Sequence, residues 1–243
     1  MSTTPRGAGS ALSVLGRGAR DSVAVAVAYL PFGLALGATL GSSHLPALLA
    51  WSTSPLLVGG AAQLLAVQLL SAGASGVVVV LAALIVNARM LLYGAALAPH
   101  AAAWPARWRW LGAYLLADPV YALAAARFSR PDGGGSARHR LLYYLGVGVT
   151  LWTAWQAMTG AGVLLAGVLP TSLHLELAAP LTFLLLLPML TSRPAYAAAT
   201  TGGLAALAAS GLPLGLGLLT GAAAGIAAGR LLETRRASRS RRD

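Results

Sequence analysis

The sequence predicts an all-α polytopic membrane protein with about eight transmembrane helices, seven being the alternative, and with both termini in the cytoplasm. Of its 243 residues, 57% are hydrophobic and only 9% are charged, and the mean hydropathy is +0.73. A soluble domain usually carries about 25% charged residues. Apolar stretches of the length that crosses a hydrocarbon core, about 20 residues, recur along the chain. The bilayer is therefore its natural solvent.

Eight apolar stretches are the candidate spans. They are 22–42, 47–71, 75–98, 110–126, 141–168, 177–192, 195–210 and 212–231. The sixth and seventh are short and are separated only by Ser192, Arg193 and Pro194, so they form either a tight hairpin or a pair in which one fails to cross. The first span is retained, because no small-residue cleavage site follows it. We expect a single transmembrane domain over 1–243.

The arginines predict the orientation of the chain. All 17 basic residues are Arg, and short cytoplasmic loops collect basic residues. With the N-terminal segment 1–20 inside, fourteen arginines face the cytoplasm, in that segment, in the loop 127–140, at Arg193 and in the stretch 230–243. Arg107 and Arg109 fall outside, and Arg89 falls within the membrane.

The basic C-terminal tail, 232–243, is expected to be disordered and to lie on anionic lipid headgroups. Topology explains the net charge of +11 better than a nucleic-acid partner does, and we expect no nucleic acid. The chain has no Cys, which excludes disulfides, thiolate metal sites and cysteine nucleophiles. Its four histidines fall in loops or at span ends, so no metal and no cofactor is expected.

Five segments bring a polar group or a helix breaker to a similar depth in the membrane. In chain order these are Phe32 with its neighbours Pro31 and Gly33, then Gln63, Asn87, Asp118, and Trp155 with Gln156. Interrupted helices free backbone groups that lipid cannot satisfy, and transporters tolerate such breaks where they line a binding site. We expect helix ends at Pro31–Gly33 and at Ser54–Gly60.

Arg89 and Asp118 are the most informative members of this layer. An arginine at the bilayer centre costs about 2.5–3.5 kcal/mol on insertion scales, so it must face a protein interior or a wet cavity and find an anion. Asp118 is the only acid near the centre of any span, and a structural Arg89–Asp118 bridge is one solution. The other is that Arg89 binds an anionic ligand through a bidentate contact.

The chemistry of this layer suits a small zwitterion or anion. Arg89 would bind a carboxylate, and Asp118 would meet an ammonium or carry a proton. Gln63 and Asn87 would bind polar groups, while Phe32 and neighbouring aliphatic residues would surround an apolar side chain. The residues themselves lead to a transporter-like site and no further.

The stretches YLPFGLALG (29–37), PLLVGGAAQ (55–63), NARMLLYG (87–94), ADPVYALAAARF (117–128) and TLWTAWQAMTGAGVLLAGVLP (150–170) resemble the AzlC-type branched-chain amino acid permeases. The resemblance runs from about residue 20 to 230 and is most specific at Gln63 and at Asn87, Arg89 and Tyr93. It implies a multi-pass exporter of branched-chain or similar neutral amino acids in the bacterial inner membrane. It also implies a small AzlD-type membrane subunit as partner.

This chain departs from the family pattern at three places. Met90 stands where a His is common, Ala62 replaces a Ser, and Asp118 is followed by Pro119 where an Asp–Glu pair is common. The absent second acid leaves proton handling by a carboxylate pair and the identity of the substrate open.

Three other classes of protein remain to be weighed. One is an importer or a passive channel for a small solute, and another is a scaffold subunit in which Arg89–Asp118 is only a bridge. A membrane-embedded enzyme fits poorly, because no two acids share the membrane centre and no His lies at depth. We therefore expect no catalytic residues.

Overall fold

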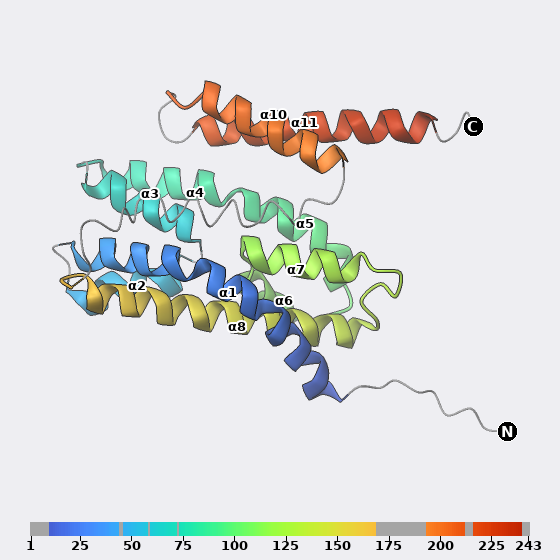
Figure 1. The fold of residues 1–243 in the computed structure, drawn as a ribbon, viewed down its shortest axis with the longest axis horizontal. Helices are drawn as coiled ribbons and strands as arrows, with labels where there is room; N and C mark the ends of the chain where they lie inside the picture. Colours follow the sequence, from blue (N-terminus) through green and yellow to red (C-terminus); the bar gives the residue numbers. More distant parts are fainter. Residues whose placement is uncertain are drawn as a thin grey trace. The chain divides into compact units, whose positions relative to one another are not determined.

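The computed structural model describes most of the chain, and within the described residues it contains helices and no strands (Figure 1). The described ranges are 10–43, 46–57, 59–71, 73–168, 193–211 and 216–239. The chain separates into two compact units. The first unit is Met1–Gly60 with Arg89–Thr182, and the second is Ala61–Ala88 with Phe183–Asp243. That the two make a single membrane domain stays a prediction.

The first unit is built on two long helices that run in the same direction. Its helices are α1 (Ala11–Gly41), α2 (Ala47–Leu56), α5 (Arg89–Ala101), α6 (Ala106–Tyr114), α7 (Asp118–Phe128) and α8 (Ala137–Leu165). At 1.5 Å per residue, α1 and α8 are each more than about 40 Å long. They approach so closely that a side chain at Gly37 of α1 or Gly162 of α8 would meet the backbone of the other helix. Each begins at a serine cap, Ser10 and Ser136.

The second unit contains α4 (Gly76–Asn87), α10 (Arg193–Ala208), α11 (Leu216–Arg239) and nearly all of α3 (Gly60–Ser71). α10 and α11 pack as an antiparallel pair. Gly202 of α10 faces Gly221 of α11, and Ala198 faces Gly225. These small residues let the two backbones approach, as is usual at helix interfaces in membranes.

Within the part of the chain that the structure describes, two helical stretches are long and apolar enough to cross a membrane, Ala11–Gly41 and Gly76–Ala101. The first covers the predicted span 22–42 up to Gly41. The second covers the predicted span 75–98 from Gly76, with a break at Ala88 between α4 and α5. α8 covers most of the predicted span 141–168 and has the length but a lower apolar content. The stretches 195–210 and 212–231 correspond to α10 and α11, and the stretch 177–192 lies outside the described residues.

The predicted interruption at Pro31–Gly33 is wrong, because α1 continues through Pro31 to Gly41. A proline removes one backbone hydrogen bond, and α1 accommodates this loss at Pro31, which is followed by the buried residues Phe32 and Gly33. The interruption expected at Ser54–Gly60 is present: α2 ends at Leu56 and α3 begins at Gly60. Tyr114 stabilises the end of α2 by donating a hydrogen bond of 2.9 Å to the carbonyl of Pro55.

The prediction of one span over 110–126 is also wrong. This stretch forms two short helices, α6 and α7, separated by Leu115–Ala117. His100 at the end of α5 lies against Phe128 at the end of α7, with ring centroids 5.2 Å apart. Trp104, just before α6, lies 5.4 Å from the Tyr144 ring of α8. The start of α6 and the end of α7 therefore lie at the same end of the first unit, and the two helices form a hairpin.

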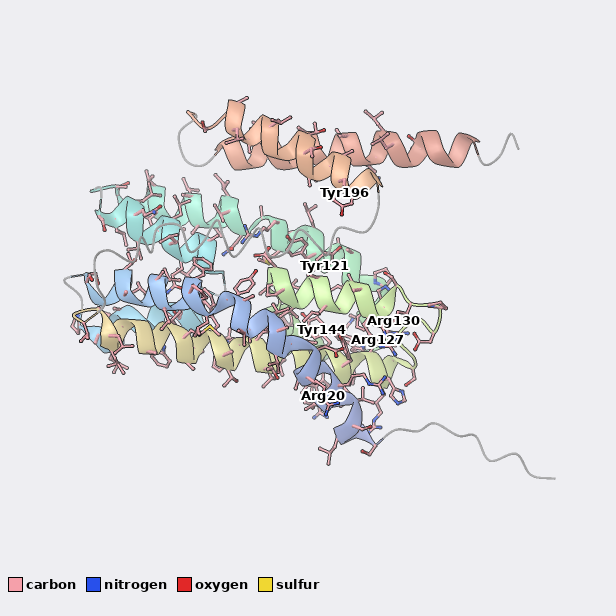
Figure 2. The ribbon with its side chains drawn as sticks, viewed as in Figure 1. Arg20, Tyr121, Arg127, Arg130, Tyr144 and Tyr196 are labelled. Carbon is pink, nitrogen blue, oxygen red and sulfur yellow. The ribbon has the colours of Figure 1, made fainter. Side chains whose placement is uncertain are left out.

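Because of this hairpin, the arginines are distributed differently from the sequence prediction. Eight arginines lie toward one end of the first unit, which we call the arginine-rich end; Figure 2 labels three of them. They are Arg17, Arg20, Arg107, Arg109, Arg127, Arg130, Arg138 and Arg140. Among the described residues at its opposite end, in 46–57 and 159–168, none is charged. The separation of Arg107 and Arg109 from the loop 127–140 was therefore wrong, because within the first unit both groups of arginines lie at the arginine-rich end.

The C-terminal tail differs from the expectation as well. α11 continues through the basic stretch to Arg239, although disorder was expected from residue 232. Residues 230–239 contain no Gly and no Pro. Most of them are Arg, Leu, Glu or Ala, which favour helices.

Candidate functional site

Arg89 and Asp118 are each the first residue of a helix, α5 and α7, and they form an ion pair. Nη2 of Arg89 donates a hydrogen bond of 3.0 Å to Oδ2 of Asp118. Nε of Arg89 lies 3.0 Å from Oδ1. The two side chains are 20% and 18% exposed. The predicted pairing is thus present, at the start of two helices that run side by side toward the arginine-rich end.

Tyr93 is the third member of this group. Its hydroxyl donates a hydrogen bond of 3.0 Å to Oδ1 of Asp118. The ring of Tyr93 stacks on Tyr121, with centroids 4.3 Å apart and planes at 8°, and Figure 2 labels Tyr121 on α7. Arg89 and Tyr93 are four residues apart on α5, and Asp118 and Tyr121 are three apart on α7. Such spacings place each pair on one helix face, so the two faces meet through an ion pair and a stacked pair.

An aromatic cluster lies beside this group in the first unit. Phe32 of α1 and Trp155 of α8 have ring centroids 5.3 Å apart. Tyr29 lies 6.5 Å from each of them. Tyr29 also interacts electrostatically with Asp118, Arg89 and Tyr93, which links the cluster to the charged pair. Gly60 packs on the edge of the cluster, where an added Cβ would lie 2.7 Å from Trp155.

Two buried polar side chains near the cluster lack a hydrogen-bond partner among the described residues. The first is Tyr29, through its hydroxyl, and the second is Gln156, through both the oxygen and the nitrogen of its side-chain amide. Tyr29 is 9% exposed and Gln156 is 8% exposed. The backbone of Gln156 is fixed, because Nε1 of Trp51 donates to its carbonyl at 3.1 Å. Buried polar groups are usually paired, so these groups are available for a ligand or for water.

The remaining predicted residues have other surroundings. Gly33 of α1 packs against Met158 of α8, where an added Cβ would lie 2.6 Å from that of Met158, so its observed role is close packing. Gln63 and Asn87 belong to the second unit. Gln63 is buried, and the side-chain oxygen of Asn87, at the end of α4, is buried without a partner among the described residues. Their participation in the site stays a prediction.

The arrangement can hold opposite charges at neighbouring positions. Arg89 and Asp118 begin α5 and α7, and a helix N-terminus carries a partial positive charge that favours anions. A carboxylate could therefore bind at Arg89, and a cation could replace the guanidinium at Asp118. Among the described residues, no group of three His, Asp or Glu side chains could hold a metal ion.

Sequence reasoning missed two residues of this site, Tyr29 and Tyr121. Tyr29 opens the YLPFGLALG stretch and lies three residues before Phe32, on the same helix face. Tyr121 lies three residues after Asp118. Helical spacing from the residues already selected would have identified both.

Comparison with known proteins identifies a family whose sequence model covers the residues of this site in the first unit. No curated protein and no solved structure matches the chain. The sequence model of one family, described as AzlC protein, matches residues 24–169, a range that includes Tyr29, Arg89, Asp118 and Trp155. This match covers more than half of the 243 residues, and the chain therefore belongs to the AzlC family, whose members are membrane proteins related to branched-chain amino acid transport.

Proposed function

We propose that this protein is the large subunit of a secondary transporter that exports branched-chain or similar neutral amino acids across the bacterial inner membrane. The observation that carries the proposal is the Arg89–Asp118 pair, which joins the starts of two helices inside a largely apolar chain. Family membership supports the substrate class. The arginine-rich end would face the cytoplasm, as the positive-inside pattern predicts.

The proposed binding step separates the charged pair. The carboxylate of an amino acid would take the place of Asp118 at Arg89, and its ammonium would take the place of Arg89 at Asp118. One ion pair then becomes two, so no charge is left unpaired in a site where an unpaired charge is costly. Tyr93 would keep Asp118 in position during the exchange through its 3.0 Å hydrogen bond.

The aromatic cluster would bind the apolar side chain of the substrate. Phe32 and Trp155 present ring surface, and Tyr29 joins that surface to the charged pair. The buried amide of Gln156, which has no partner among the described residues, would supply a donor or an acceptor. A branched aliphatic side chain gains from burial against such rings by about 25 cal/mol per Å².

Partner and coupling follow from the same proposal. A small AzlD-type membrane subunit would complete the transporter, and Asp118 would be the carboxylate that carries a proton if transport is proton-coupled.

Amino acid efflux from cells preloaded with dipeptides tests the proposal. The cells would express this chain alone, this chain with the neighbouring small membrane protein, or either with Arg89→Ala. Faster efflux of valine, leucine or methionine that the substitution abolishes is the expected result. Equal efflux with and without the chain in every pairing would refute an export function.

A scaffold role is the second candidate, and the ion pair itself favours it, because a paired arginine and aspartate are satisfied without any ligand. A double variant in which the two charges are exchanged would keep the bridge. In a scaffold the exchanged variant behaves like the parent, whereas in a transporter it loses the orientation in which substrate binds.

A further inference from the structure

A polar pocket of about 220 Å³ lies at the arginine-rich end of the first unit, away from the Arg89–Asp118 pair. The start of α1, the connection between α7 and α8, and the start of α8 form its walls. The side chains that matter for its chemistry are Ser13, Arg17, Arg127, Asp132, His139 and Tyr143.

The only carboxylate in this lining is already occupied. Asp132 accepts hydrogen bonds of 2.7 and 2.8 Å from Nη1 and Nη2 of Arg127, and a third of 3.2 Å from the backbone N–H of Gly134. A cation that entered the pocket would therefore find no free carboxylate among these lining residues. The chemistry of the pocket favours an anion.

Two cationic or donor groups in the pocket wall remain free for such an anion. Arg17 makes no ion pair or hydrogen bond with any described residue, although it lines the pocket. His139 has one ring nitrogen, Nδ1, 2.7 Å from the hydroxyl of Ser136, which leaves Nε2 for a ligand. Arg127 also lines the pocket, with a side chain that is only 14% exposed, but its Nη1 and Nη2 are already bound to Asp132.

The wall formed by the α7–α8 connection is held in a defined shape. Gly133, Gly134 and Gly135 have φ of 58°, 75° and 81°, a conformation that glycine adopts without strain. Nη1 of Arg140 donates to the carbonyls of Gly133 and Gly135 at 3.3 and 2.8 Å. With Arg127 on Asp132, two arginines therefore fix this short loop at both edges before any ligand binds.

We propose that this pocket binds a phosphate group, carried either by an anionic membrane lipid or by a free phosphate ion. Phosphate supplies several acceptor oxygens and a negative charge, which match the guanidinium of Arg17 and the Nε2 of His139, and Arg127 stands beside them on Asp132. The arginine-rich end is the end that the charge pattern assigns to the cytoplasmic membrane surface, where lipid phosphates lie. This site is separate from any contact that the basic C-terminal stretch makes with lipid, and it does not depend on the transport proposal.

Binding to the purified full-length chain tests this inference. The probes are inorganic phosphate added to protein in detergent, and nanodiscs of phosphatidylglycerol compared with nanodiscs of phosphatidylcholine. The variants are Arg17→Gln and His139→Gln. Arg20→Gln is the matched control, because Arg20 lies one turn further along α1 and does not line the pocket.

We expect Arg17→Gln to weaken binding about tenfold, which corresponds to the loss of one charge-assisted hydrogen bond, and Arg20→Gln to leave it unchanged. Binding of inorganic phosphate to the protein in detergent identifies a soluble ligand. Binding only to nanodiscs of phosphatidylglycerol identifies a lipid headgroup. Equal losses in Arg17→Gln and Arg20→Gln would show general charge attraction and overturn the site. Failure of both probes to bind would overturn it too.

Discussion

His100 lies against Phe128, with the two ring centroids 5.2 Å apart, although a crossing helix between them would place them on opposite sides of a membrane. The contact follows from the break at Leu115–Ala117, which turns the chain back on itself between α6 and α7. Asp118 stands at the tip of this hairpin, next to Arg89. The chain thus runs along α6 from the arginine-rich end to the charged pair, and along α7 back to the same end.

The hairpin predicts that residues 103 and 129 are accessible from the same side of the membrane. The chain has no Cys, so single substitutions Ala103→Cys and Ser129→Cys can be labelled directly with a membrane-impermeant maleimide. Both positions are exposed. We expect both to react only when the cytoplasmic face is accessible.

The control for this experiment is Leu48→Cys, at the start of α2 and 74% exposed. Leu48 lies toward the opposite end of the first unit, so it should react from outside the cell. Labelling of residues 103 and 129 from opposite sides would contradict the hairpin and restore a crossing helix.

Close packing of α1 on α8 predicts a large effect of a single methyl group. In Gly37→Ala the new Cβ would meet the backbone of α8 at Thr159 and Gly162. We expect a loss of about 1–3 kcal/mol in the free energy of unfolding, typical of overpacking, measured by thermal denaturation in detergent. Gly16→Ala, in the same helix with nothing within 4 Å of the new Cβ, should be neutral or stabilising by up to about 1 kcal/mol.

Tyr93 is predicted to position Asp118 for substrate binding. Tyr93→Phe keeps the ring that stacks on Tyr121 and removes only the hydroxyl that donates to Asp118. We expect KM for efflux to rise by about fivefold, as for loss of one hydrogen bond to a charged group at a partly exposed site, with little change in protein abundance. An unchanged KM would show that the hydroxyl has no part in binding.

The loop between α7 and α8 should resist acid. Hydrogen bonds from Arg127, together with the N–H of Gly134, lower the pKa of Asp132 from 3.8 to about 2. A lowered carboxyl pKa means that this stabilisation is complete above the ordinary pKa of 3.8 and is lost as the pH falls through about 2. Hydrogen exchange of residues 133–135 should therefore stay slow down to about pH 4.

The matched variant is Asp132→Asn, which should exchange several-fold faster at residues 133–135 at neutral pH. Ser129→Ala, whose hydroxyl bonds only to the carbonyl of Ala125 in the preceding turn, is the control. If the two variants exchange equally fast, the ion pair does not hold the loop.

Much of the site could be predicted from the sequence because its energetics are local to a few residues. Arg89 and Asp118 are the charged residues nearest the centres of apolar stretches, and the cost of a charge in lipid requires them to be paired or solvated. A bridge between them was one of the two solutions that the sequence left open, and the structure contains that bridge. The stacking of Tyr93 on Tyr121 could not be predicted, because it depends on α5 and α7 lying side by side.

The α6–α7 hairpin shows where sequence reasoning failed. Residues 110–126 have the length of a span, and apolar content does not distinguish one crossing helix from two half-helices. The signal was present in the charges: Arg107 and Arg109 were the only arginines placed outside by a single crossing. That exception, together with Pro119 beside Asp118, indicated a break. Pro31 shows the converse, since a proline inside α1 breaks nothing.

Exchange of the two central charges tests the account most directly. Arg89→Asp combined with Asp118→Arg would be compared with the parent for efflux of valine, leucine and methionine, with membrane abundance measured in parallel. A substrate site predicts that the double variant inserts normally and does not transport, because the positions of the substrate carboxylate and ammonium are reversed. Efflux at the rate of the parent would contradict that site and leave Arg89 and Asp118 as a structural bridge.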